Sequence, residues 1–485
     1  MNLQIHDSMP NRSDSHYDLI VIGAGQGGGP LAGAFARAGK RVALVERAHL
    51  GGSCINIGCS PTKTIVASAR IAHLAGRSGE YGVRFADGAA AEPTITVDLR
   101  RVRERKQQIV DSFRTGSERA LASAGVDLIR AHARFTAPRT VETVGPDGNA
   151  TLTADVVVIN TGLRSAVPPI PGLDEIDYLT STSIMELTDV PEHLVIMGGG
   201  YTGLEFAQAY RRFGSRVTVV ERGSQLLAHE DEDIADAVAA ILRDDGIEVL
   251  LNAEVTSAAR VGDSLLVNWR ASGTSDGEDV CSVRGTQLLV ASGRRPNTDD
   301  LGLDAAGVCT DDRGYINASE RLETSEPGTY VIGDVKGGPA FTHISYDDFR
   351  VLRANLLDGG SMTTAGRVVP YTVFIDPQLG AVGITEREAR ASGRNIRVAK
   401  LPMSHVARAL EVDETRGLMK AVVDADTQRV LGARVLGIEG GEIAALFQIA
   451  MMGDLPYTAL RDAVFSHPTT AEALNSLFTA MDREG

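Results

Sequence analysis

The first regular pattern in the chain is an apolar run of strand length at residues 17–22, followed by a cluster of glycines at residues 23–28. Small and apolar residues at 30–38 are typical of a closely packed helix, and a second apolar run at 41–46 ends in an acidic residue. Apolar runs of this length predict strands, and the glycine cluster predicts a turn between the first strand and the helix. The segment therefore predicts a strand–turn–helix–strand unit.

The same pattern occurs a second time. It consists of an apolar run, a glycine turn, a helix and an apolar run ending in an acid, at residues 193–197, 198–203, 204–213 and 216–221. In both copies the acid follows the first glycine by 23 positions. Ordinary glycine turns of an α/β fold do not keep strand, helix and acid in step, so we interpret both copies as dinucleotide-binding units.

The glycines and the acid have physical roles in such a unit. The first glycine permits a tight turn, the second lets a phosphate approach the backbone, and the third lets the helix pack on the strand. The helix N-terminus attracts the pyrophosphate, and the acid accepts hydrogen bonds from a ribose diol. The residues concerned are Gly23, Gly25, Gly28 and Glu46 in the first copy and Gly198, Gly200, Gly203 and Glu221 in the second.

Three further apolar runs end in glycine, at Thr161–Gly162, Gly293 and Gly333–Asp334. Ligands of α/β folds bind at the carboxyl ends of strands, and Asp334 would place a carboxylate there. A loop glycine after a buried strand is the alternative interpretation at each position.

The repeat also predicts the domain organisation. We expect a discontinuous first nucleotide domain at residues 1–155 and 288–360, with a helical insertion near 100–124, and a second nucleotide domain at 156–287. Beyond residue 360 the pattern changes. It predicts strands at 371–375, 417–424 and 429–437, followed by helices at 443–452, 457–463 and 471–481. The predicted fold class is α/β, with two Rossmann-like dinucleotide-binding domains and a C-terminal α+β domain at 361–485.

Length, composition and charge narrow the class of protein. A chain of 485 residues with 43% apolar and 23% charged residues is typical of a globular protein of about three domains. The net charge of −15 argues against nucleic-acid and anionic-membrane partners. No apolar run approaches the length of a membrane span, and residues 1–16 lack the pattern of a signal peptide. We therefore expect an N-terminal extension and a cytoplasmic protein.

Two of the four cysteines, Cys54 and Cys59, are five positions apart in a glycine-rich segment. Five residues of regular helix span about 7.5 Å, beyond the reach of a disulfide, so we expect a bent segment, which Gly58 permits. Pro61 suits the first position of a helix that continues over 62–75. Cys59 would then precede a helix N-terminus with Lys63 one turn on, and both effects favour its thiolate.

The cysteine pair could also be half of a metal site. No second cluster of cysteine or histidine supplies the remaining ligands, which favours a redox disulfide, and no resident metal ion is predicted. Cys281 and Cys309 are expected to be ordinary buried or loop cysteines.

His467 near the C-terminus precedes a proline and is followed by Glu472. The proline favours an extended backbone at the histidine, and the glutamate is within reach to orient the imidazole ring. This arrangement suits an acid–base catalyst for thiol exchange, with a surface histidine as the alternative.

These motifs, in this order, resemble the FAD-dependent pyridine nucleotide–disulfide oxidoreductases of class I, such as dihydrolipoamide dehydrogenase, glutathione reductase and mercuric reductase. The resemblance covers residues 17–481 and is most specific at 51–63, at the two glycine motifs, at 333–334 and at 467–472. It implies FAD on the first glycine motif, NADH or NADPH on the second, and a homodimer formed by the third domain.

The resemblance also implies roles for single residues. Cys59 faces the flavin, and Cys54 attacks a small-molecule substrate. His467 and Glu472 act on Cys54 of the partner subunit, so the active sites are shared between subunits.

The remaining implied contacts belong to the two dinucleotides. Lys63 is implied to pair with Glu205 beside the flavin ring. The residues implied to contact FAD are Gly23, Gly25, Gly28, Glu46, Ser53, Lys63, Thr161, Gly162, Asp334, Thr342 and His343. Those implied to contact NAD(P) are Gly198, Gly200, Gly203, Glu221, Arg222 and Gly293. Glu221 favours NADH, whereas Arg222 suits the 2′-phosphate of NADPH.

Within the family, residues 52–64, 341–350 and 455–462 are similar to the mercuric-reductase-like branch. They are more similar still to bacterial reactive-chlorine-resistance flavoproteins, which reduce hypothiocyanous acid. Mercuric reductases carry a C-terminal cysteine pair, often an N-terminal metal domain, and no His-Pro-Thr motif. Here residues 478–485 contain no cysteine, no metal domain precedes Tyr17, and His467 is present, which argues against Hg(II) reduction.

The resemblance implies a ping-pong reductase that passes electrons from NAD(P)H to a sulfur-type or reactive oxidant, such as hypothiocyanous acid or a disulfide. Dihydrolipoamide dehydrogenase is one alternative, because it shares the His-Pro-Thr-x-x-Glu motif. A mercuric or other metal-ion reductase is a second. A metal-binding or redox-sensing flavoprotein, which uses its cysteines stoichiometrically, is a third. The sequence does not encode the electron acceptor.

Overall fold

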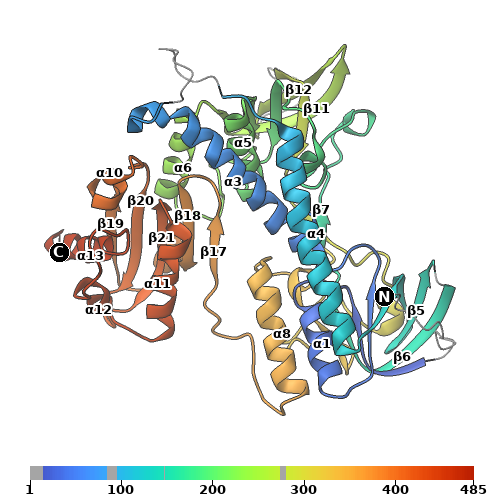
Figure 1. Ribbon diagram of the computed structural model, residues 1–485. Helices are drawn as coiled ribbons and strands as arrows, with labels where there is room; N and C mark the ends of the chain where they lie inside the picture. Colours follow the sequence, from blue (N-terminus) through green and yellow to red (C-terminus); the bar gives the residue numbers. More distant parts are fainter. Residues whose placement is uncertain (1–14, 85–94, 147, 274–279, 485) are drawn as a thin grey trace, which may run out of the picture. The chain divides into compact units, whose positions relative to one another are not determined.

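The computed structural model describes residues 15–84, 95–146, 148–273 and 280–484 (Figure 1). They form two compact units. The first comprises the described residues up to Pro61 together with Gln107–Arg164 and Arg294–Arg367, and the second comprises the rest. The three-domain division expected from the sequence is finer than these units and stays a prediction. Most of the expected N-terminal extension, residues 1–14, lies outside the described residues, whereas Ser15 and His16 begin the first strand.

The first unit is built on a seven-stranded sheet. Its strands are β1 (Ser15–Ile22), β2 (Val42–Glu46), β3 (Asp127–Arg130), β4 (His132–Ala137), β5 (Thr140–Gly145), β6 (Gly148–Ile159) and β16 (Thr329–Val331). The order is β3-β2-β1-β6-β5-β4, with β16 also paired to β6. Strands β1, β2, β3, β6 and β16 pair in parallel, and β4 and β5 continue the sheet in antiparallel fashion.

Both faces of this sheet are buried. Leu19 and Val21 of β1 pack in one cluster, which includes α1 (Gly28–Arg37) and α8 (Thr342–Leu356), while Ile20 and Ile22 pack in another. Helices α1 and α8 lie beside one another (Figure 1). Burial on both faces explains why β1 is a continuous apolar run rather than an alternating one.

The second unit repeats the same arrangement. Strands β8 (His193–Met197), β9 (Arg216–Val220), β10 (Glu248–Leu250) and β14 (Gln287–Val290) are all parallel, in the order β10-β9-β8-β14. The corresponding order in the first unit is β3-β2-β1-β6. The expected duplication is confirmed, although the helices after the glycine turns, α1 and α5 (Tyr201–Phe213), begin two or three residues earlier than the sequence pattern predicts.

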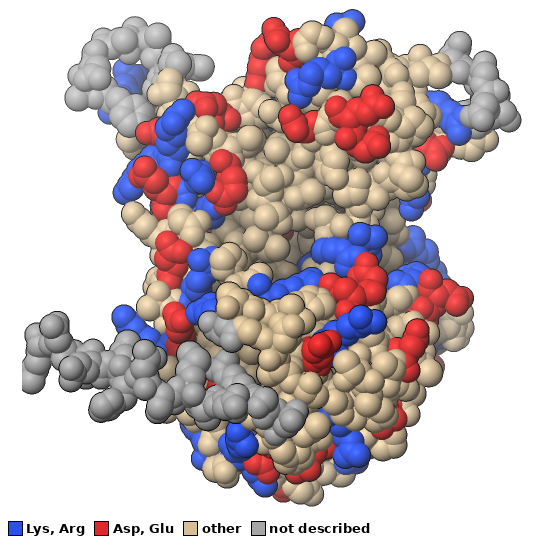
Figure 2. Space-filling view, turned by 90° about the vertical axis from the view of Figure 1, so that its right-hand side faces the viewer, with Lys and Arg blue, Asp and Glu red and all other residues tan. Residues whose placement is uncertain are grey.

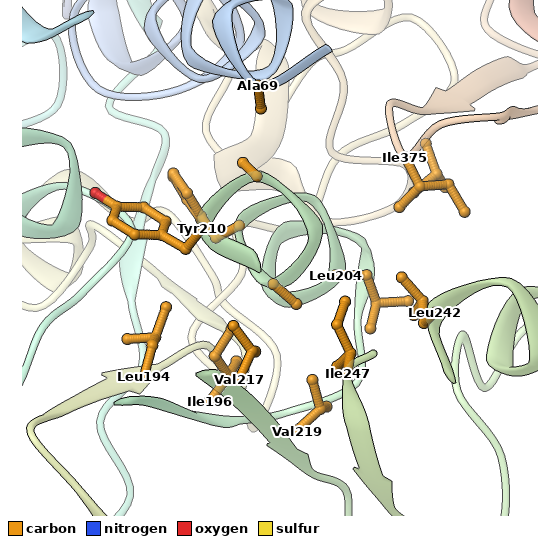
Figure 3. Packing of buried hydrophobic residues seen from close by; sticks show 14 of the residues in the cluster. Ala69, Leu194, Ile196, Leu204, Tyr210, Val217, Val219, Leu242, Ile247 and Ile375 are labelled. Atoms are coloured by element: carbon orange, nitrogen blue, oxygen red, sulfur yellow. The ribbon is translucent and has the colours of Figure 1, made fainter. Parts of the chain in front are cut away.

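Helix α5 packs on the second parallel sheet (Figure 3). Leu204 and Tyr210 of α5 belong to one buried cluster with side chains from β8 and β9, among them Leu194, Ile196, Val217 and Val219. Leu242 of α6 (Glu232–Asp244) belongs to the same cluster and lies beside Leu204 of α5. This core holds the start of α5, and with it the second glycine turn, in place.

The rest of the second unit contains two antiparallel sheets. Strands β11 (Ala253–Val261), β12 (Ser264–Ala271) and β13 (Cys281–Gly285) form one. Strands β17 (Pro370–Val373), β18 (Gln378–Gly383), β21 (Val430–Gly437), β20 (Leu418–Asp424) and β19 (Ile396–Pro402) form the other, in that order. With α11 (Gly440–Met452), α12 (Tyr457–Arg461) and α13 (Ala473–Glu484), the latter confirms the α+β class of the C-terminal region. Strands β18 and β19 were not expected, because glycines in β18 and the terminal proline of β19 obscure the strand pattern.

Two long helices lie outside these sheets. Helix α3 (Cys59–Gly76) begins two residues before Pro61, earlier than expected. Proline fits in the first turn of a helix because the amides there have no intrahelical acceptor. Helix α4 (Leu99–Ala124) is the expected helical insertion. Among the described helices, none combines the length and apolar character that crossing a bilayer requires. Basic and acidic side chains are interspersed on the face shown in Figure 2.

Candidate active site

The two glycine turns have the same backbone geometry. Gly23 has φ +103° and Gly198 has φ +114°. A Cβ atom at Gly23 would lie 2.4 Å from the carbonyl oxygen of Asn160, and one at Gly198 would lie 2.6 Å from that of Ala291. Any side chain would therefore both strain the backbone and collide with the neighbouring strand. Glycine is required at the start of each turn.

The acids at the strand ends hold these turns. Glu46 accepts 2.8 Å hydrogen bonds from the amides of Ala24 and Ala48. Glu221 accepts 2.6 Å bonds from the amides of Gly199 and Gly223, which occupy the equivalent positions. Each carboxylate oxygen has capacity for a second hydrogen bond, so both acids can also accept a ribose hydroxyl.

The helices after the turns begin without side chains that would compete with a bound anion. Neither α1 nor α5 has a side-chain cap or an acidic residue in its first turn. The first amides of such helices attract anions such as a pyrophosphate. Glycine turn, helix start and acid together fit one dinucleotide in each unit.

Asp334 lies in the first unit, next to Gly333, in the short 3₁₀ helix Gly333–Lys336 that follows β16. Burial raises the pKa of its carboxyl, although Arg294 at 3.3 Å opposes this effect. The carboxyl is 20% exposed and accepts one hydrogen bond, from Arg294, so it has capacity for the hydroxyls of a sugar-alcohol chain. FAD carries such a chain, so the residues of the first unit fit FAD.

Asn160 was not singled out from the sequence, although it directly precedes Thr161. Its side chain donates to the carbonyl of Gly23 at 3.2 Å. A Cβ at Gly25, Gly28 or Gly333 would come within 3 Å of the same side chain. Asn160 thus lies between the first glycine turn and the turn that carries Asp334. The sequence feature that could have identified it is its position at the end of an apolar run, two residues before Gly162.

The two cysteines lie in the first unit, one on the short helix α2 and the other at the start of the long helix α3. Cys54 belongs to α2 (Gly52–Asn56), and Cys59 is the first residue of α3, so the expected bend is present. Both thiols are free, and Cys59 is the more exposed of the two. A hydrogen bond to Cys59 and burial together raise the pKa of the Cys54 thiol well above its usual range.

Cys59 also contacts a second helix start. Its Sγ lies 3.2 Å from Oγ1 of Thr342, the first residue of α8. Positive helix ends and a hydroxyl donor favour a thiolate. The charge of the pair is therefore expected on Cys59, while Cys54 holds its proton.

Lys63 lies one turn after Cys59 on α3 and pairs with Glu205 of α5. The Nζ–Oε2 distance is 2.6 Å, and Glu205 is 2% exposed against 30% for Lys63. The other oxygen of Glu205 accepts the amide of Phe374, whose ring lies under the Lys63 ammonium at 4.8 Å. The lysine is thus held at a defined position on α3.

His467 and Glu472 form an exposed pair in the second unit. Glu472 lies 2.9 Å from Nδ1 of His467, which leaves Nε2 for another partner. The His467 side chain is 69% exposed. Glu472 therefore fixes the orientation of an imidazole ring that is exposed on the surface of the second unit.

The other predicted residues occupy the following places. Thr161 and Asn297 hydrogen-bond each other through side chains and backbone, and Gly162 and Gly293 have positive φ. Ser53 lies on α2 and His343 on α8, where it stacks on Phe341 at 5.2 Å. Arg222 is exposed. Cys281 and Cys309 are both exposed. Cys309 lies in a loop, as expected for one of the two environments, whereas Cys281 begins strand β13, so the expectation of a buried or loop cysteine is wrong for it. Among the described residues, no three His, Cys, Asp or Glu side chains are grouped to bind a metal ion.

Each unit has a glycine turn, helix start and acid that fit a dinucleotide, and the first unit also carries a cysteine pair. This combination is typical of redox enzymes that transfer electrons between two dinucleotide cofactors. Residues 17–348 match the family profile "Pyridine nucleotide-disulphide oxidoreductase", and residues 369–478 match the profile of its dimerisation domain. The chain belongs to the pyridine nucleotide–disulfide oxidoreductase family, whose members use FAD and NAD(P)H.

Known relatives cover nearly the whole chain. It is 39% identical to the probable pyridine nucleotide-disulfide oxidoreductase RclA of Escherichia coli, over 96% of this chain and 99% of the relative. The solved structure of the Cu(II) complex of RclA from Escherichia coli, described as an HOCl-induced flavoprotein disulfide reductase, is similar, with a TM-score of 0.86 and 38% identity over 96% of this chain and 99% of that chain. A mercuric reductase of Staphylococcus aureus is 33% identical over 99% of this chain and 85% of the relative.

Proposed function

We propose that the chain is an FAD-dependent NAD(P)H oxidoreductase in which Cys54 and Cys59 cycle between dithiol and disulfide. The observation that carries the proposal is the position of Cys59, at the start of α3, beside Cys54 and 3.2 Å from Thr342. The first glycine turn belongs to the same unit. Bound FAD would supply a two-electron redox centre between the nicotinamide and the cysteine pair.

The substrate step consists of two displacements at sulfur. The Cys54 thiolate attacks a disulfide R–S–S–R, so a mixed disulfide forms and one R–S⁻ leaves. Cys59 then attacks the Cys54 sulfur, and the second R–S⁻ leaves. Two thiols become one disulfide and the substrate gains two electrons. With hypothiocyanous acid the same two displacements release water and thiocyanate.

Cys54 needs a base for this step, since its hydrogen bond to Cys59 and its burial raise its pKa. The oriented imidazole of His467 is suited to take that proton and to return it to the leaving group. By family resemblance it reaches Cys54 of a second copy.

The homodimer that this requires is supported by the match to a dimerisation domain. The same region exposes large apolar side chains, and a second copy would cover them. They are Ile449, Met452, Leu455 and Val464.

NADH is the proposed electron donor. Glu221 is positioned by two backbone amides at the end of β9, where a carboxylate accepts ribose hydroxyls and repels a 2′-phosphate. Arg222 next to it is exposed and would have to reorient to bind that phosphate.

A steady-state screen tests the proposal. The acceptors are hypothiocyanous acid, small disulfides, lipoamide, Hg(II) and Cu(II), with NADH or NADPH as donor. We expect many turnovers and parallel double-reciprocal lines with a sulfur acceptor, and loss of turnover in Cys54→Ser. Fast NAD⁺ reduction by dihydrolipoamide would favour dihydrolipoamide dehydrogenase instead. Turnover with metal ions alone would favour the activity named for the mercuric reductase relatives, and a single turnover would favour a redox sensor.

A further inference from the structure

The segment between the two cysteines is fastened by one side chain. Asn56 is the last residue of α2 and lies between Cys54 and Cys59. Its Nδ2 donates 2.8 Å hydrogen bonds to the carbonyls of Leu50 and Gly52, at the start of the same short helix. Asn56 therefore ties the end of the Cys54 helix back to its beginning.

Arg114 of α4 fixes the orientation of Asn56. Its Nε and Nη2 donate to Oδ1 of Asn56 at 3.1 and 2.8 Å. A flip of the amide would break all four hydrogen bonds, because two donors face its oxygen and two acceptors face its nitrogen. Arg114 and Asn56 belong to the first unit, with the cysteines.

A five-residue helix is not stable alone, because its first turn costs more conformational entropy than its few hydrogen bonds return. Helix α2 thus depends on its tertiary contacts to stay closed. The geometry of a disulfide is narrow, so the stability of the Cys54–Cys59 bond depends on how often the thiols are held close together.

We propose that Arg114 is a positioning residue for the redox pair. It acts through Asn56, which keeps α2 closed and the Cys54 thiol next to Cys59, and so favours the disulfide over the dithiol. The proposal rests on the redox role of the cysteines stated above. Arg114 is 58 positions from Asn56 in the chain, so its role does not follow from the local sequence.

The test is the equilibrium of the flavin-bound protein with glutathione buffers. In that reaction one glutathione disulfide oxidises Cys54 and Cys59, and two glutathione molecules are released. The fraction oxidised is measured by acid quenching, thiol alkylation and mass spectrometry. We expect Arg114→Met to lower the equilibrium constant at least roughly fivefold, equivalent to about 20 mV at 29.6 mV per tenfold change. Arg119→Met, at an exposed arginine of the same helix, is the matched control and should leave it unchanged.

Two further variants separate positioning from general stability. Asn56→Ala should lower the constant by a similar factor, and adding Arg114→Met to it should have no further effect, since both act through one contact. Arg114→Lys, which retains one donor, should lie between wild type and Arg114→Met, and provides the measurement if the methionine variant does not fold.

The outcomes distinguish this proposal from the function on which it rests. A wild-type protein whose two cysteines never form a disulfide would overturn both. A wild-type disulfide whose equilibrium constant stays within twofold in Arg114→Lys and Arg114→Met would overturn the role of Arg114 alone. Effects of Asn56→Ala and Arg114→Met that multiply would also overturn it, because they would then act independently.

Discussion

The hydroxyl of Thr342 lies 3.2 Å from the sulfur of Cys59, and each residue is the first of its helix. Two helix N-termini that are 283 positions apart in sequence thus meet at one thiol. A thiol in this position differs from Cys54, whose pKa is raised by its hydrogen bond to Cys59 and by burial. Thr342 and Ser60 lower the pKa of Cys54 by less than Cys59 and burial raise it, so we expect the thiolate on Cys59 and the proton on Cys54.

Removing the hydroxyl should make Cys59 less reactive. In Thr342→Val we expect alkylation of Cys59 by iodoacetamide at pH 7 to slow roughly threefold to tenfold, because a hydrogen bond to the thiolate is lost. The rate is measured on the reduced protein by peptide mass spectrometry across pH 5–9. Thr342→Ser retains the hydroxyl and should behave like wild type. An unchanged pH profile in the valine variant would show that the hydroxyl does not stabilise the thiolate.

The pair of Lys63 and Glu205 should respond unequally to substitution. Lys63→Met leaves the 2% exposed carboxylate of Glu205 without its cation and should lower the thermal midpoint more than Glu205→Gln. Glu205→Gln leaves Lys63, at 30% exposure, partly hydrated and keeps an acceptor for the amide of Phe374. The midpoints are compared by differential scanning fluorimetry. Equal losses in the two variants would argue against a buried, uncompensated charge.

Much of this architecture could be predicted from the sequence. The parallel strands are continuous apolar runs because they are buried on both faces, and the glycine turns recur because their φ values and close contacts allow only glycine. The bend between Cys54 and Cys59 followed from helix geometry and disulfide reach. Strand β18 was missed because a glycine interrupts its apolar pattern, and β19 because it ends in a proline, a residue uncommon in strands.

The contacts that set chemistry could not be predicted in the same way. Thr342 was expected only as a flavin contact, and nothing local indicates that its hydroxyl meets Cys59. The same holds for Arg114, whose partner Asn56 lies on another helix. Periodicity identifies which face of an element is buried, whereas the register between distant helices is set by the packing of the whole unit.

Asp334 should destabilise the flavin-free protein. Burial raises its pKa, so the folded state binds a proton more readily than the unfolded state, and stability falls as pH rises from about 3.8 through the folded-state pKa. Asp334→Asn should therefore raise the thermal midpoint of the flavin-free protein at pH 7, with a smaller gain at pH 4. It should also weaken FAD retention on gel filtration. A lower midpoint at pH 7 would contradict the buried-charge explanation.

The choice of nicotinamide should depend on Glu221. Glu221→Gln keeps an acceptor for one backbone amide and removes the charge that repels a 2′-phosphate. We expect the ratio of kcat/KM for NADH to that for NADPH to fall at least roughly tenfold. Arg222→Ala is the companion variant and should leave the ratio at or above the wild-type value. A ratio that drops in Arg222→Ala and not in Glu221→Gln would assign the preference to the arginine.

Counting thiols before and after reduction by NADH gives the sharpest test of the redox role of the cysteine pair. The oxidised, flavin-bound protein is reduced anaerobically with NADH, quenched in acid, alkylated and mapped by mass spectrometry. Two new thiols should appear, at Cys54 and Cys59, while Cys281 and Cys309 stay as they were. Cys59→Ser should show no new thiol. Reduction of the bound flavin with no change at Cys54 and Cys59 would contradict the proposed function.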